Sequence, residues 1–146
     1  VQNSLANKMP HQPRPTEAEL ELLNILWRRG SMSCSELGKF QREPETSRRR
    51  SRLLREMIAK GFIERDSTRA LGHYLAVVDE DTVKNSLIQL LLEQLFDNST
   101  RVLILHALSH AYLSEEDLGE IRGALRDMER RSQAPKPPKQ VGQAPH

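Results

Sequence analysis

The chain has 146 residues, enough for one domain of ordinary size or two small lobes. Its single cysteine, Cys34, excludes an internal disulfide and a cysteine-rich metal site. No apolar run is long enough to span a bilayer, and the N-terminal residues lack the apolar core of a secretory signal. These features predict a soluble, cytoplasmic protein with no membrane insertion.

The basic residues gather in one short part of the chain. Residues 1–78 hold 14 basic and 9 acidic side chains, a net charge of +5, whereas residues 79–146 hold 8 and 11, a net charge of −3. Within residues 46–69 the count is 8 basic to 3 acidic. Such a concentration is typical of a surface that binds a polyanion.

The first helix is expected to start after residues 1–14, which are polar and proline-punctuated and are predicted to be disordered. Val1 is not a start residue, and the segment before Met9 is set aside from the fold prediction. Thr16 and Glu19 have the spacing of a capping box, and Gly30 ends the helix. Its apolar face consists of Leu20, Leu23, Ile25, Leu26 and Trp27.

Two further helices and a hairpin follow. Ser33 and Glu36 repeat the capping-box spacing at the start of a short helix, from which Leu37 and Phe40 are expected to point inward. A third helix, capped by Thr46 or Ser47, runs to Lys60 and ends at Gly61. The sequences FIERD and HYLAVV then predict two strands joined by the turn STRALG. Three helices and a hairpin in this order predict a winged helix-turn-helix over residues 15–78, with the third helix entering the DNA major groove.

Residues 79–131 are predicted to form three helices of a different kind. The first, over DEDTVKNSLIQLLLEQLF, is too broadly apolar for one face of a solvated helix. The second, capped by Asn98 or Ser99, covers NSTRVLILHALSHAY, and the third starts at Ser114 and Asp117. In the third helix four apolar residues are spaced 3, 4 and 3 apart, as in a coiled-coil contact: Leu118, Ile121, Leu125 and Met128. These helices predict a dimerisation lobe, and residues 132–146 a disordered, proline-rich tail. The fold class is therefore mainly α, with a winged helix-turn-helix followed by a helical dimerisation lobe.

The third helix begins with an arginine run that a helix N-terminus disfavours, because the macrodipole is already positive there. A helical wheel places Arg48, Arg52 and Arg55 roughly opposite the apolar face, which comprises Leu53, Leu54, Met57 and Ile58, and Arg49 on its flank. Facing DNA would explain these charges, since arginine pairs with guanine or with phosphate oxygens. A solvated cationic face is the plainer interpretation. Because the arginines lie in the third helix of a DNA-binding unit, DNA contact is favoured over the solvated face.

Arg50 falls near the middle of the apolar face. It can snorkel, pair with a carboxylate such as Glu36 or Glu45, or precede a regular helix that starts only near Ser51. The wheel does not choose between these alternatives.

Other side chains give weaker indications of chemistry. His106 and His110 stand four apart, a spacing that can hold a metal, but two ligands without a further partner favour ordinary helix residues. Cys34 is expected to pack as a small apolar side chain rather than to act as a redox switch. No nucleophile elbow or glycine-rich phosphate loop is present. We therefore expect no enzyme activity, no metal site and no cofactor.

Five segments in order resemble the BlaI/MecI/CopY family of penicillinase-type repressors: PTEAELELLNILWRRG, LLREMIAKGFIERD, HYLAVV, LLEQLFDNS and LSEEDLGEIRGAL. The resemblance covers about residues 15–130. It implies a transcriptional repressor that binds a palindromic DNA operator as a homodimer. It also implies a membrane sensor-protease as a partner, which releases the DNA by cleaving the repressor in its C-terminal lobe.

Three departures from the family pattern bear on function. Arg49, Arg50, Ser51 and Arg52 replace a Thr-Val-x-Thr pattern, so operator preference does not carry over, and more arginine suggests a G-richer site or heavier phosphate contact. His106-Ala107 stands where some members have the cleaved Asn-Phe pair. That candidate cleavage region therefore does not establish β-lactam-type induction. The C-terminal cysteine cluster of copper-responsive members is missing, which rejects copper sensing through that motif.

These considerations assign candidate roles to named residues. The expected DNA contacts are Ser47, Arg48, Arg49 and Arg52 in the groove, with Arg55 and Arg69 on phosphates. The expected dimer positions are Leu91, Leu95, Leu105, Leu118, Ile121 and Leu125. Two other functions stay open: a winged-helix-shaped adaptor that contacts protein, and a regulator that senses a small molecule.

Overall fold

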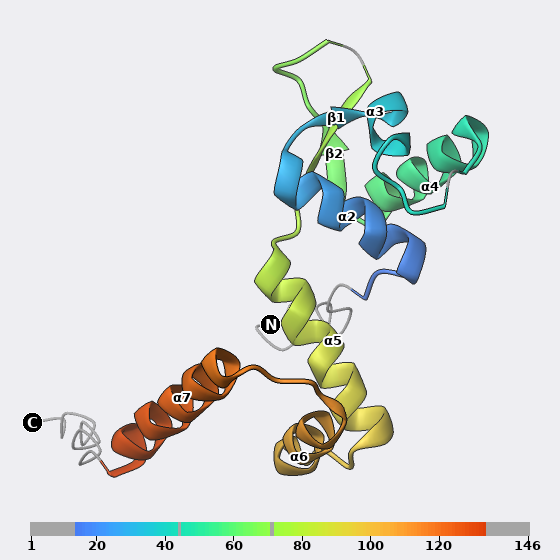
Figure 1. The fold of residues 1–146 in the computed structure, drawn as a ribbon. Coiled ribbons are helices and arrows are strands. Elements are labelled where there is room, and N and C mark those ends of the chain that lie inside the picture. The colour runs from blue at the N-terminus through green and yellow to red at the C-terminus, as the bar shows by residue number, and fades with distance from the viewer. Residues whose placement is uncertain (1–13, 44, 71, 134–146) are drawn as a thin grey trace, which may run out of the picture. The chain divides into compact units, whose positions relative to one another are not determined.

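The computed structural model describes residues 14–43, 45–70 and 72–133. Figure 1 shows a mainly helical chain with one small sheet. Two compact units divide it, Val1–Thr100 and Arg101–His146. The first therefore includes α5 (Glu80–Leu95) as well as the winged helix. The predicted division of roles at residue 79 between DNA binding and dimerisation stays a prediction.

Local capping determines where the first helices begin. In α2 (Glu17–Arg29) Thr16 and Glu19 form the predicted capping box, and Gly30 ends the helix at φ +81°. In α3 (Cys34–Gly38) Ser33 and Glu36 form a second box. Thr46 caps α4 (Ser47–Ala59), its hydroxyl accepting from the amide of Arg49 at 3.2 Å. These three starts are as predicted.

The sheet has three antiparallel strands in the order β1-β3-β2. The predicted hairpin is formed by β2 (Ile63–Arg65) and β3 (His73–Ala76), with Arg65 opposite Tyr74. A short strand that was not predicted, β1 (Met32–Ser33), pairs with the other edge of β3, Met32 opposite Tyr74. This strand ties the start of α3 to the wing.

One hydrophobic core joins α2, α3, α4 and the sheet. Its central side chains are fully or nearly fully buried: Leu22, Leu23, Leu26, Leu37, Leu54, Met57 and Ile63. Trp27 packs beside them, and its indole N–H donates to the carbonyl of Val78 at 2.9 Å. The Glu19 carboxylate is buried in the same region and accepts two hydrogen bonds from the Lys60 ammonium, at 2.8 and 3.0 Å. The start of α2 is thereby fixed to the end of α4.

Phe40 corrects one expectation about this core. It was predicted to point inward with Leu37, but 41% of its surface is exposed and the Arg29 guanidinium lies 3.7 Å from its ring centre. The prediction was wrong because α3 ends at Gly38, so the helical period that buries Leu37 does not reach residue 40.

The remaining helices are α5, α6 (Thr100–His110) and α7 (Glu115–Gln133). Asp79 caps α5, and Ser114 and Asp117 bond reciprocally at the start of α7. Asp97 and Asn98, at the end of α5, have φ of 51° and 59°, a left-handed conformation that aspartate and asparagine tolerate.

The two predicted disordered segments lie mostly outside the described residues. Arg14 is described and forms an ion pair with Glu93 at 3.5 Å. At the other end Ser132 and Gln133 belong to α7, so the predicted tail boundary at residue 132 was too early. The arginines of the last turn suit a helix C-terminus and extend α7 to this point.

Candidate nucleic-acid interface

One side of α4 is a row of exposed basic side chains. Leu54 and Met57 are completely buried and fix which side of the helix faces the core. The residues predicted to enter the groove or contact phosphate are all exposed on α4: Ser47, Arg48, Arg49, Arg52 and Arg55. Since the helix repeats every 3.6 residues, Arg48, Arg52 and Arg55 share one side of it. The result is a straight cationic edge on the third helix of the domain.

The flank of this edge has an acidic neighbour. Arg49, Arg52, Glu45 and Glu56 line a shallow hollow of about 190 Å³ together with Ala18. The hollow thus places two carboxylates beside two of the arginines proposed for the groove.

Arg50 does not belong to the exposed row. Only 7% of its surface is exposed, and α4 begins at Ser47, so a late helix start is ruled out. Its guanidinium donates to the carbonyl of Cys34 at 2.7 Å, the side-chain oxygen of Gln41 at 3.0 Å and the carbonyl of Glu45 at 3.1 Å. None of the three alternatives holds as stated, because the buried guanidinium does not snorkel to water and its hydrogen bonds go to uncharged oxygens rather than to a carboxylate. The sequence indicated this only as an arginine at an apolar helix position.

Cys34 stands beside Arg50 at the contact between α3 and α4. Its thiol lies 3.5 Å from the Ser51 hydroxyl and 3.9 Å from the Ser47 carbonyl, and the side chain packs against the core. The predicted packing role of Cys34 therefore agrees with its surroundings.

The wing brings the sixth predicted DNA contact, Arg69, to an exposed loop after β2. Its guanidinium donates to the carbonyl of Ser31 at 2.9 Å, which connects the wing loop to the residue before β1. The same loop contains Asp66, whose pKa is lowered to about 2 by the nearby Ser31 side chain, by hydrogen bonds from the hydroxyl and amide of Thr68 and by the charge of Arg69. Asp66 is thus ionised at neutral pH. One Arg69 nitrogen is already used, and the others remain available to a ligand.

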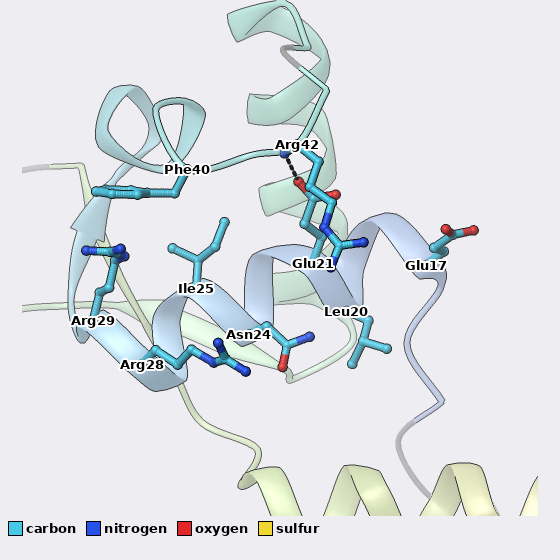
Figure 2. Close-up of a pocket in the computed structure, with 9 residues that line it drawn as sticks. All are labelled: Glu17, Leu20, Glu21, Asn24, Ile25, Arg28, Arg29, Phe40 and Arg42. Atoms are coloured by element: carbon cyan, nitrogen blue, oxygen red, sulfur yellow. Dashed lines mark hydrogen bonds between the residues drawn. The ribbon is translucent and has the colours of Figure 1, made fainter. Parts of the chain in front are cut away.

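A larger groove lies on the outer side of α2. Figure 2 shows its lining, in which Phe40 and Arg42 stand opposite α2. The groove has a volume of about 430 Å³. Two contacts hold parts of its lining together: the Arg42 amide donates to the Glu21 carboxylate at 2.8 Å, and the Arg29 guanidinium lies over the Phe40 ring. These contacts suit a solvated protein surface.

The predicted dimer positions lie on α5, α6 and α7, and none of them is fully buried. Leu91, Leu95, Leu105 and Leu125 are 41%, 71%, 54% and 49% exposed, and Leu118 and Ile121 are half-buried. Neither α6 nor α7 contains a buried residue. The apolar side chains of these two helices are therefore available to another surface.

The C-terminal unit also contains the candidate cleavage region and the histidine pair. His106 and Ala107 lie within α6 with exposed side chains. The rings of His106 and His110 stack with their centres 4.6 Å apart. Among residues 14–43, 45–70 and 72–133, no cluster of three or more His, Cys, Asp or Glu side chains is arranged to hold a metal ion. Within the same ranges no helix has the length and apolar character needed to cross a membrane.

Comparison with known proteins gives a consistent relationship over nearly the whole described chain. Residues 15–127 match the model of the penicillinase repressor family. The chain is similar to the penicillinase repressor of Staphylococcus aureus, with 26% identity over 129 residues that cover 87% of this chain and 100% of that protein. It is also similar to the methicillin resistance regulatory protein MecI of Mammaliicoccus sciuri, 25% identical over 75% of this chain and 91% of that protein. MecI of S. aureus strain N315 is 24% identical over the same shares. The match to the family model spans more than half of the sequence, and the chain belongs to the penicillinase repressor family.

Proposed function

We propose that this protein is a transcriptional repressor that binds a palindromic DNA operator as a homodimer. The observation that carries the proposal is the exposed arginine row of α4, on the third helix of a winged helix-turn-helix in a repressor family. In such domains the corresponding helix lies in the major groove, where side chains near its N-terminus contact base edges. The arginines stand in the first turns of α4, as that geometry requires.

The proposed contacts divide into two classes. The groove contacts are assigned to four exposed or polar residues in the first two turns of α4: Ser47, Arg48, Arg49 and Arg52. Arginine can donate two parallel hydrogen bonds to O6 and N7 of guanine, which distinguishes a G·C pair from the others. Arg55, further along the helix, and Arg69, on the wing, are assigned to phosphates, which position the protein without reading sequence.

The second copy is proposed from the C-terminal helices. In a single protomer no residue of α6 or α7 is buried, so the apolar side chains of these helices stay in contact with solvent. Burying a leucine contributes roughly 1.5–3 kcal/mol, so pairing these helices with another copy would give a substantial driving force. Two identical domains related by a two-fold axis would then match an operator of two inverted half-sites.

We extend the proposal to release from DNA. The family resemblance suggests cleavage in the C-terminal lobe by a membrane sensor-protease, and His106-Ala107 is the candidate bond. Exposed side chains at both residues support access, but the bond lies inside α6, so the helix must open locally before a protease can bind it. Intact-mass measurement before and after loss of repression tests this step; a chain that remains whole would eliminate it.

Fluorescence anisotropy tests DNA binding directly. The full chain is titrated onto the duplex upstream of its own gene and onto a random duplex, across a salt series. The Arg48→Ala/Arg52→Ala variant removes two charges from the proposed interface, and Arg28→Ala/Lys84→Ala removes two exposed charges from α2 and α5 as the matched control.

Tight binding that prefers the upstream duplex, weakens with salt and is lost only in the α4 variant would support the repressor. If the α4 variant binds as well as the wild-type chain, the arginines are ordinary surface charge. The adaptor function would then be the better explanation of the fold.

A further inference from the structure

The buried guanidinium of Arg50 joins three parts of the chain that meet at the head of α4. Its acceptors belong to Cys34, which begins α3, to Gln41, in the segment between the helices, and to Glu45, just before the cap of α4. The three bonds are 2.7–3.1 Å long. One side chain therefore joins the start of α3, the segment between the helices and the residue before the cap of α4.

An apolar residue would satisfy the core at this position without these bonds. Arg50 lies on the same side of α4 as Leu54 and Met57, which are completely buried. Placing a charge there costs free energy unless hydrogen bonds compensate it. All three acceptors are uncharged oxygens, so the bonds fix geometry without neutralising the guanidinium. The arginine is consequently better explained by its effect on the turn than by its contribution to packing.

Gly38 provides the space that the guanidinium occupies. A Cβ atom on Gly38 would lie 2.5 Å from Nη2 and 2.6 Å from Cζ of Arg50, closer than real Cβ atoms approach other atoms. Gly38 is not among the glycines with positive φ, so its backbone accepts alanine and only the Arg50 side chain would be displaced. Residues 38 and 50 thus form a matched pair.

We infer that Arg50 is a positioning residue for DNA recognition: it fixes the first turn of α4 against α3 and thereby sets the aim of Arg48, Arg49 and Arg52. The inference rests on the proposed function, because aim matters only if these arginines contact bases. Side chains on the first turn can contact bases productively only while that turn keeps one orientation. Arg50 acts from the opposite side of the helix and itself touches no DNA.

Three variants separate positioning from packing. Arg50→Met keeps an apolar stem of similar length but has no donors. Gly38→Ala keeps arginine at position 50, but the new Cβ displaces its guanidinium. The double variant gives the alanine the space that the guanidinium vacates, and Arg28→Met, which removes an exposed charge from α2, is the control.

Two measurements are made on each full-length variant. The first is anisotropy on the upstream and random duplexes. The second, which needs no DNA, is hydrogen–deuterium exchange of backbone amides 45–53, including that of Arg50, which donates to the Thr46 carbonyl at 3.0 Å in the first turn. Thermal unfolding identifies any variant that fails to fold, and Arg50→Lys, which retains the charge and one donor group, then replaces Arg50→Met.

Each single variant is expected to bind the upstream duplex about tenfold more weakly, the equivalent of about 1.4 kcal/mol. Binding to random DNA should change little, exchange in residues 45–53 should become faster, and the double variant should lose no more than either single one. Wild-type selectivity in Arg50→Met would overturn the inference, and so would losses that add in the double variant. If the wild-type chain itself shows no selectivity, the proposed function fails. Exchange then decides the positioning role separately, since unchanged rates in both single variants refute it.

Discussion

The buried Glu19 carboxylate should stabilise the winged helix in a pH-dependent way. Its residue surface is 0% exposed, and it accepts hydrogen bonds from the Lys60 ammonium and from the amide of Thr16 at 2.8 Å. Burial alone would raise the pKa of Glu19, but the bonds from Lys60 and Thr16 outweigh burial and hold the pKa below its ordinary value of 4.5. The ionised form is therefore the one that the fold prefers.

Substitution of Glu19 by glutamine tests this contribution. The amide keeps the size of the side chain and an acceptor for Thr16 but loses the charge that attracts Lys60. Hydrogen bonds to charged groups contribute about 1.5–3 kcal/mol. The Lys60 side chain is 46% exposed and regains water when released, so we expect the lower end, about 1.5 kcal/mol at pH 7.

The sign of the pH dependence follows from the lowered pKa. A carboxyl group whose pKa is lower in the folded than in the unfolded chain stabilises the fold fully above the unfolded value and loses this effect as the pH falls through the folded value. The difference between the wild-type chain and Glu19→Gln should therefore be constant near neutrality. It should narrow progressively below about pH 4.5.

Urea unfolding followed by the fluorescence of Trp27 is the assay. Trp27 is the single tryptophan and packs beside the core, so it reports on the unit that contains Glu19. Glu64→Gln, at an exposed position on β2, is the matched control. A loss at pH 7 no greater than that of the control would refute the argument, and so would a loss that persists unchanged at pH 3.

Three other substitutions test the proposed interfaces. Arg52→Ala should weaken binding to the upstream duplex by roughly 1–3 kcal/mol and reduce selectivity in anisotropy titrations; equal losses on random DNA would make it a phosphate contact. Arg69→Ala should weaken binding to both duplexes alike and lower the salt slope by about one. This holds if the wing keeps its place when the hydrogen bond from Arg69 to the Ser31 carbonyl is lost. Leu125→Glu should weaken the free energy of dimerisation by roughly 2 kcal/mol or more, which sedimentation velocity would show as a shift from dimer to monomer. An unchanged dimer would place the interface elsewhere.

The elements that the sequence predicted well are specified by neighbours within a few residues. Thr16 with Glu19, Ser33 with Glu36, and Thr46 each begin a helix through bonds to amides three residues away. The two-residue strand β1 has no such local cause. It exists because the end of α2 brings Met32 beside Tyr74, a contact 42 positions distant along the chain. Short strands of this kind depend on the assembled fold and leave no period in the sequence.

The C-terminal helices show a different limit. The apolar pattern of α6 and α7 is the same whether its residues face their own chain or a second copy. In the structure no residue of either helix is buried within the chain. The predicted dimer positions, such as Leu105 and Leu125, are therefore available for a partner. Their spacing in the sequence does not determine which residues of two copies would contact one another.

The arginine run shows how identical residues acquire different roles through the helical period alone. Arg48 and Arg49 are exposed to solvent. Arg50, one position later, turns toward the core, and only 7% of its surface is exposed. Charge alone would make the three interchangeable, and alanine at each would then weaken DNA binding with a similar salt dependence. The geometry predicts unequal behaviour instead. Loss of Arg48 or Arg49 should remove a contact that salt screens, while loss of Arg50 should disturb the turn and reduce selectivity at every salt concentration.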